Sequence, residues 1–227
     1  MANIKNKKKL VEDNTISVAE AITLLKKACQ EKQRKFVENV DLAINLSIDP
    51  KQTNQNIRGS VALPAGSGKQ VKVIVFTADE AMQKEALSAG ATIAGLDELM
   101  TKIEGGFLDF DYCVATPEAM KKMGKIAKIL GPRGLMPNPK NGNITTDVVK
   151  VVKEILKGKV DFKNDKFGIV HIGVGKINFA DGDLLNNIKS VISALKEIKP
   201  EGVKGKYIKN IYLTSTMGPS FMISMDK

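Results

Sequence analysis

The sequence predicts an α/β protein of two domains: a discontinuous α+β domain made from both ends of the chain, and an inserted, doubly wound α/β domain of Rossmann-like type. Strand-like segments near both ends alternate apolar and polar residues, as in a sheet with one buried face. Segments in the middle are almost continuously apolar and alternate with helical patterns, as in a parallel sheet covered on both faces. A glycine-rich stretch over residues 66–69 separates the two patterns. We therefore expect one domain over residues 1–67 and 160–227, and the inserted domain over 68–159.

The two ends of the chain supply half-polar strands and one amphipathic helix each. Ser17 and Glu20 have the spacing of a capping box, and apolar residues then recur at helical spacing as far as Cys29. In the second half, we expect Asp181 to cap a long helix that ends near Ile198, before a proline. The strands that the alternation predicts are 40–48, 61–63, 167–174, 207–215 and 221–224.

The middle of the chain indicates repeated strand–helix units. The expected strands are 71–76, 91–94 and 112–115, and the expected helices are 79–88, 96–104, one opened by Pro117, and 146–157. Cys113 falls inside one of the buried strands. Residues 131–143 are rich in glycine, proline and asparagine, so they cannot form a regular helix or strand.

Charge and composition restrict the partners of the chain. Of its 227 residues, 35 are Lys or Arg and 25 are Asp or Glu, which gives a net charge of +10 and a pI near 9.4. This charge favours a polyanionic partner, either a nucleic acid or an anionic membrane surface. No apolar run approaches the roughly 18 residues of a membrane span, and the basic amino terminus lacks the apolar region of a secretory signal. We therefore expect a cytoplasmic protein with no membrane partner.

Several kinds of chemistry are disfavoured by the residue types. Two cysteines and one histidine are too few for a disulfide framework, a four-cysteine zinc site or a histidine-rich metal site. His171 lies within an apolar strand, where a packed histidine is the preferred interpretation. Tryptophan is absent and aromatic residues make up 5%, which argues against extended base-stacking platforms. The carboxylate pairs 109/111 and 181/183 lie at element ends, where caps and turns explain them better than catalysis does. We expect no catalytic residue and no metal site.

The glycine-rich stretch also fails the requirements of a phosphate-binding loop. Leu63 stands where the first glycine is needed, Gln70 follows Lys69 where a hydroxyl is needed, and a strand follows instead of a helix. A hinge between domains is the simpler interpretation. The glycines of a dinucleotide-binding fingerprint are missing after the first inserted strand, since residues 77–80 contain none. We therefore expect no cofactor.

Two other segments have features that suit a polyanion. Four lysines would share one face of a helix that leads to Arg133 and Lys140 on the irregular loop; they are Lys121, Lys122, Lys125 and Lys128. Phosphate contact is one interpretation and a solvated lysine face is the other. The turn 215–219, Ser-Thr-Met-Gly-Pro, combines small hydroxyls with a glycine that permits close approach of a ligand, and a plain hairpin turn is the alternative.

Four segments are irregular enough to be specific: residues 58–64, 128–140, 167–176 and 215–219. They include Gly-Pro-Arg-Gly-Leu-Met-Pro-Asn-Pro at 131–139 and Thr-Met-Gly at 216–218. These segments resemble the bacterial ribosomal protein L-one family, whose members belong to the mobile stalk of the large subunit. The resemblance covers essentially the whole chain, and the segments follow one another in the same order as in the family. The resemblance implies two domains, binding of large-subunit ribosomal RNA chiefly by the first, and no catalysis. It also implies assistance to tRNA release from the exit site, repression of the protein's own operon through its mRNA, and a monomer off the ribosome.

The resemblance further implies which residues face the RNA: Phe36, Glu38, Asn39, Asp41, Asp165, Lys166, Thr216, Met217 and Gly218. Secondary RNA contacts are expected from Lys125, Lys128, Arg133 and Lys140. The chain departs from the family at 39–41, where Thr-Val-Glu is common, and at Asn210, where serine is common. The carboxylate and amide present here still suit 2′-hydroxyls. Two other classes stay open on composition alone: a nucleotide-dependent enzyme built on the inserted domain, and a basic DNA-packaging protein.

Overall fold

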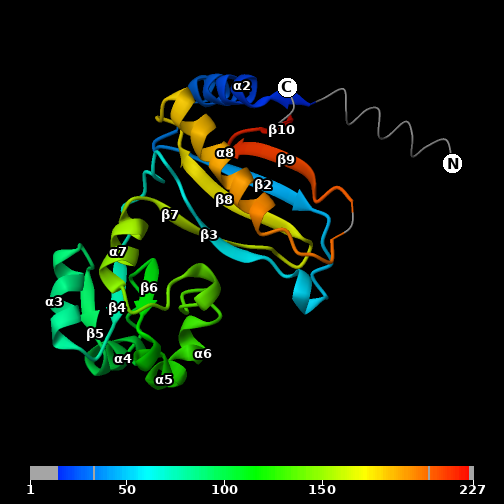
Figure 1. Ribbon diagram of the computed structural model, residues 1–227. Coiled ribbons are helices and arrows are strands. Elements are labelled where there is room, and N and C mark those ends of the chain that lie inside the picture. The colour runs from blue at the N-terminus through cyan, green and yellow to red at the C-terminus, as the bar shows by residue number, and fades with distance from the viewer. Residues whose placement is uncertain (1–14, 33, 204, 225–227) are drawn as a thin grey trace. The chain divides into compact units, whose positions relative to one another are not determined.

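The computed structural model describes residues 15–32, 34–203 and 205–224, so the expected tail over residues 1–15 lies outside it except for residue 15. The contacts divide the chain into two compact units (Figure 1). Unit 1 consists of the described residues up to Gly68 and from Val160 onward, and unit 2 is Lys69–Lys159. The chain therefore crosses between the units twice, after residue 68 and after residue 159.

Unit 1 is built on a five-stranded sheet that draws strands from both ends of the chain. In sheet order the strands are β1 (Ile16–Ser17), β10 (Ser220–Ser224), β9 (Ile208–Ser215), β2 (Asn39–Leu46) and β8 (Ile169–Lys176). β1 pairs parallel with β10, and all other neighbours are antiparallel. Because β2 lies between β9 and β8, neither end of the chain can complete this sheet alone.

Two helices cover one face of this sheet: α2 (Val18–Glu31) and α8 (Asp181–Glu197) (Figure 1). The even-numbered residues of β2, such as Leu42 and Ile44, are buried and share one core with Ile22 of α2 and Ile188 of α8. The predicted capping box is present, since the Ser17 hydroxyl accepts from the Glu20 N–H and the Glu20 carboxylate accepts from the Ser17 N–H. The odd-numbered residues of β2 consequently lie on the opposite face.

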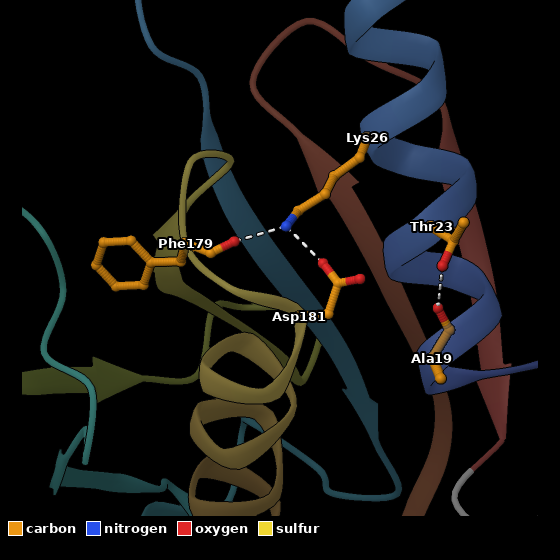
Figure 2. A network of polar contacts seen from close by, with 5 residues as sticks. All are labelled: Ala19, Thr23, Lys26, Phe179 and Asp181. Atoms are coloured by element: carbon orange, nitrogen blue, oxygen red, sulfur yellow. Dashed lines mark hydrogen bonds and ion pairs between the residues drawn. The ribbon is translucent and has the colours of Figure 1, made fainter.

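The start of α8 differs from the expectation that Asp181 caps it. Ala180 is the cap residue, and Asp181 is the first residue of the helix. The Asp181 carboxylate instead pairs at 2.5 Å with Lys26 Nζ of α2, and Lys26 also donates to the carbonyl oxygen of Phe179 at 2.6 Å (Figure 2). Lys26 therefore joins α2 to the turn that leads into α8, which a local capping rule could not predict.

A smaller pair of strands extends the core of unit 1. β3 (Arg58–Ala62) pairs with β7 (Lys159–Lys163), and the 3₁₀ turn η1 (Thr53–Gln55) precedes β3. Phe162 packs into the unit 1 core, although the sequence pattern predicts no strand there. The glycine-rich stretch after β3 is attached to this unit. The buried amide of Asn187 accepts from the N–H of Ala65 and donates to the carbonyl oxygens of Gly66 and Val174.

Unit 2 is a three-stranded parallel sheet covered on both faces, which agrees with the predicted α/β class. The strands, in sheet order, are β5 (Ile93–Gly95), β4 (Val73–Phe76) and β6 (Tyr112–Ala115). The helices are α3 (Glu80–Ser88), α4 (Asp97–Glu104), α5 (Pro117–Lys122), α6 (Ala127–Leu130) and α7 (Val148–Leu156), with 3₁₀ turns η2 (Met123–Lys125) and η3 (Pro139–Asn141). Every residue of β4 is buried, with Ile74 and Phe76 in one core cluster and Val73 and Val75 in another. Cys113 is buried as predicted, and burial raises the pKa of its thiol.

Candidate nucleic-acid interface

The sheet of unit 1 has a polar face on the side away from α2 and α8, which we call the open face. Its residues come from the three central strands and are mostly half-exposed: Asn39, Asp41, Ala43 and Asn45 on β2, His171 and Gly173 on β8, and Asn210, Tyr212 and Thr214 on β9. Asp41 lies between Gly173 and Thr214, and Asn45 lies beside Asn210. Amides, hydroxyls, one carboxylate and one imidazole therefore form a continuous surface that can both donate and accept hydrogen bonds.

The expectation that His171 is packed inside the protein is wrong, because its side chain is exposed on the open face. His171 pairs with Ala43, whose side chain is on this face, whereas Val170 and Ile172 point into the core. The alternation of apolar residues around His171 therefore indicates that the His171 side chain lies on the face opposite to the core. Near His171, Asp41 is half-buried, and burial raises the pKa of its carboxyl against the opposing effect of the imidazole.

Seven of the nine residues expected to face RNA gather where β2 begins and β9 ends: Phe36, Glu38, Asn39, Asp41, Thr216, Met217 and Gly218. The turn after β9 is attached directly to the start of β2. The Asn39 N–H donates to the Thr216 hydroxyl at 3.0 Å, and the Thr216 N–H donates to the Asn39 carbonyl oxygen at 3.1 Å. Phe36 and Met217 are 53% and 59% exposed, so each presents a large apolar side chain to solvent beside these polar groups.

Glu38 differs from its neighbours because its side chain is buried, with only 4% of the residue exposed. Its Oε2 atom accepts from the Ser215 hydroxyl at 2.7 Å and from the Met217 N–H at 3.0 Å. These two bonds hold the pKa of Glu38 below its usual range. The Ser215 hydroxyl also lies 3.3 Å from the sulfur of Cys29, which is half-buried against the core. Glu38 therefore holds the turn from inside, and the turn presents Met217 and Thr216 outward.

The glycine at position 218 has a structural cause within this network. A Cβ atom added to Gly218 would lie 2.2 Å from the Ser215 hydroxyl oxygen, closer than real Cβ contacts come. The sequence suggested that glycine allows a ligand to approach the backbone. In the structure, the group that approaches Gly218 is the hydroxyl of Ser215, which also donates to Glu38. The contacts of Ser215 with Glu38 and Cys29 join positions far apart in the chain, so no local pattern could reveal them.

A hollow of about 400 Å³ lies between the end of α2, the segment that leads to β2 and residues 177–178. Cys29, Phe36 and Glu38 contribute to its lining, together with the exposed cations Arg34 and Lys35. Positive side chains therefore share this hollow with Phe36 and with Glu38, which bonds to the 216–218 turn. Such cations can contact phosphates while the turn contacts sugars or bases.

The other two expected residues, Asp165 and Lys166, lie at the far end of β2. The turn that they occupy joins β7 to β8, and the Leu46 N–H at the end of β2 donates to the carbonyl oxygen of Gly168 in this turn. The seven residue steps from Asn39 to Leu46 correspond to about 23 Å of extended strand. The structure therefore separates these two residues from the other seven instead of gathering all nine at one point.

Asp165 uses its side chain within its own turn. Its Oδ1 atom accepts from the N–H groups of Phe167 and Ile169, both at 2.8 Å. Partial burial acts to raise the pKa of Asp165, but the backbone bonds from Ile169 and Phe167 lower it below its usual value. Lys166 is exposed, so it is the residue of this pair whose charge is presented to solvent.

The secondary set lies on unit 2, and all four side chains are exposed or half-exposed: Lys125, Lys128, Arg133 and Lys140. The single lysine-bearing helix that we expected is interrupted, because α5 ends at Lys122 and a 3₁₀ turn precedes α6. Gly124, a poor helix former, lies in that turn. The irregular loop is anchored by its own contacts, among them the Asn138 carboxamide, which accepts from the Lys140 N–H at 2.9 Å.

Other kinds of site find no support in residues 15–32, 34–203 and 205–224. Within these ranges no group of three or more His, Cys, Asp or Glu side chains is arranged to hold a metal ion. None of the helices described is both long and apolar enough to cross a membrane.

The comparisons with known proteins agree on one family. Residues 24–219 match the model of the family described as Ribosomal protein L1p/L10e. The chain is 46% identical over 215 residues to the Large ribosomal subunit protein uL1 of Coxiella burnetii (strain RSA 331 / Henzerling II). The matched region covers 95% of this chain and 91% of the relative. It is 48% identical over 207 residues to the protein of the same name from Chlamydia caviae, covering 91% of this chain and 88% of the relative. The corresponding protein of Protochlamydia amoebophila is 44% identical over 209 residues, covering 92% and 87%.

Proposed function

The chain belongs to the ribosomal protein L1p/L10e family, and from this premise we propose that it binds large-subunit ribosomal RNA directly, at the mobile stalk. As a member of this family it is a structural protein of the large ribosomal subunit and has no enzymatic role. Its place is accordingly the cytoplasmic ribosome. The observation that carries the proposal is the polar open face of unit 1, bordered by the 216–218 turn at one end and by Lys166 at the other.

The chemistry of the open face suits folded RNA. An A-form helix offers phosphates, 2′-hydroxyls and a wide, shallow minor groove, and its major groove is too narrow for side chains to enter. Amides such as Asn45 and Asn210 can donate and accept at this groove, and the carboxylate of Asp41 can accept from a 2′-hydroxyl. Arg34, Lys35 and Lys166 supply the positive charge that phosphates require.

Four further expectations follow from the resemblance to the family and are part of this proposal. The protein assists release of tRNA from the exit site as a component of the stalk. It represses translation of its own operon by binding a stalk-like structure in the mRNA, which competes with ribosomal RNA for the same surface. It is a monomer off the ribosome, and the basic residues of unit 2, such as Arg133, make secondary RNA contacts.

The direct test uses the protein in the cell. After an extract is sedimented through a sucrose gradient, we expect the chain in the fractions of large subunits and whole ribosomes, and depleted from small subunits. Ribonuclease treatment that removes the stalk RNA should release it. A chain that stays at the top of the gradient under low salt, with ribosomes intact, would contradict a structural role.

We also propose that unit 1 is a domain that carries the main RNA site by itself. Residues 1–67 joined to 160–227 by a short glycine linker should fold and bind stalk RNA within about tenfold of the full chain, since a unit with its own core can fold alone. Asn187 still has its partners Ala65, Gly66 and Val174 in this shortened chain. Circular dichroism and filter binding measure the two properties. Residues 68–159 alone are the control and should bind weakly.

The shortened chain also separates the two candidate surfaces. If it is folded but does not bind, while the full chain does, the recognition surface must include Arg133 and the other basic residues of unit 2.

A further inference from the structure

The turn between β7 and β8 presents an aromatic ring that the proposed function does not use. Phe167 is 72% exposed, the highest value among the large apolar side chains in the described part of the chain. Exposing a phenyl ring to water is unfavourable. Single exposed apolar residues are nevertheless common on protein surfaces, so exposure alone does not indicate a ligand. Three further features of this turn indicate a ligand for the ring.

The first feature is that the backbone beneath the ring is fixed. The Asp165 carboxylate accepts from the N–H groups on both sides of position 168, those of Phe167 and Ile169. The Gly168 N–H donates to the Asp165 carbonyl oxygen, and Gly168 has a φ of +77°, which suits glycine. A ring carried by such a turn loses little backbone freedom when a ligand binds it.

The second feature is a cation over the ring. Lys166 Nζ lies 5.8 Å from the centroid of the Phe167 ring, and the Lys166 side chain is exposed. A flat apolar surface with an exposed ammonium group over it matches the two parts of a nucleotide, because a base can stack on the ring while the ammonium contacts a phosphate. Lys166 and Phe167 are exposed whereas Asp165 is half-buried, so Lys166 and Phe167 are the outward groups of this turn.

The third feature is the place of the turn in the sheet. Residue 168 bonds to the end of β2, so the ring stands at the border of the open face, about 23 Å along the strand from the 216–218 turn. RNA that covers the open face from the 216–218 turn would end at this ring. One aromatic residue makes no stacking platform, but it is enough for one base.

We propose that Phe167 is a stacking site for a single unpaired base of the bound RNA, with Lys166 on a neighbouring phosphate. This inference rests on the proposed function and deepens it. It states that the RNA at this end of the open face leaves helical stacking, so that recognition combines a minor groove with one exposed base.

The test compares full-length variants that differ at the ring alone. The probe is a transcript of the stalk segment of large-subunit ribosomal RNA, at a fixed salt concentration. Phe167→Ala and Phe167→Leu should each bind about tenfold more weakly, because neither side chain offers an aromatic face on which a base can stack, whereas Phe167→Tyr should bind as the wild type does. Leu24→Ala, which removes an exposed apolar side chain from α2, is the matched control and should leave binding unchanged.

Ultraviolet cross-linking with mass spectrometry provides a second readout. The peptide that contains Phe167 should carry a cross-linked nucleotide in the wild type and in Phe167→Tyr, and should lose it in Phe167→Leu. If the wild-type protein binds the transcript tightly and Phe167→Ala binds it equally well, this inference is overturned and the proposed function stands. Equal affinity of the leucine variant would show apolar contact without stacking and would also overturn it. A wild-type chain that does not bind the transcript would remove the proposed function together with this inference.

Discussion

Replacing Glu38 with glutamine should weaken the binding of stalk RNA by about ten- to a hundredfold and destabilise the protein, because a hydrogen bond to a charged acceptor contributes about 1.5–3 kcal/mol and one to a neutral acceptor about 0.5–1.5 kcal/mol. The carboxylate accepts from the Ser215 hydroxyl and the Met217 N–H through one oxygen, and the residue is 4% exposed. A glutamine can satisfy both donors only with its single carbonyl oxygen, without the charge that strengthens such bonds. The contact that holds the 216–218 turn from inside would then be weaker.

Two measurements separate the effect on the turn from a general loss of stability. Hydrogen exchange of the Met217 amide should become faster in Glu38→Gln, while amides in the centre of β2 keep their protection. Glu31→Gln removes the same charge from an exposed side chain on α2 and should change neither stability nor RNA affinity measurably. If Glu38→Gln binds RNA as the wild type does and Met217 still exchanges slowly, Glu38 does not position the turn.

The pH dependence of stability should follow from the same contacts. In the folded protein, the bonds from Ser215 and Met217 lower the pKa of Glu38 below its ordinary value of 4.5. The stabilisation that they provide is therefore complete above about pH 4.5 and is lost as pH falls through the lowered pKa. The difference in unfolding free energy between the wild type and Glu38→Gln should accordingly be largest near neutral pH and shrink in acid. A difference that grows in acid would contradict this assignment.

Local patterns predicted the elements of this protein better than the contacts between them. The alternation in β2 and the capping box at Ser17 are properties of a few consecutive residues, and both are present in the structure. The continuous apolar run of β4 likewise predicted a strand that is buried on both faces. In contrast, the pairing of Lys26 with Asp181 joins residues 155 positions apart, so the sequence suggested only a local cap for Asp181.

The candidate site shows the same division. The resemblance gathered Glu38, Asn39 and Thr216 as residues that face RNA, and the structure does bring them together. The resemblance could not show that Glu38 points inward, because the direction of this side chain depends on Ser215, 177 positions away. The exposed side of His171 could have been predicted from the alternation of its neighbours, had the apolar run been divided into its two faces.

The affinity for stalk RNA should fall by about three orders of magnitude between ~50 and ~200 mM salt, as expected for a protein that neutralises several phosphates. The motivation is the distribution of charge in unit 1. Among the described residues, the centre of the open face carries no lysine or arginine, and the cations stand at its borders, with Arg34 and Lys35 at one end and Lys166 at the other. The salt-dependent part of binding should therefore come from these borders, and the open face should supply contacts that salt hardly affects.

Single substitutions can assign the charges that take part. Lys35→Ala and Lys166→Ala should each reduce the slope of log affinity against log salt by about one, which is the expected effect of losing one phosphate contact. Lys196→Ala removes an equally exposed lysine from α8, on the other side of the sheet, and should leave the slope unchanged. Asp41→Asn should weaken binding at every salt concentration without reducing the slope, since it alters a contact to a 2′-hydroxyl. A flat salt response would mean that the protein neutralises no phosphates and would contradict this prediction. A slope that Lys196→Ala reduces as much as Lys166→Ala does would mean that RNA is attracted by net charge alone and that the open face is not where it binds.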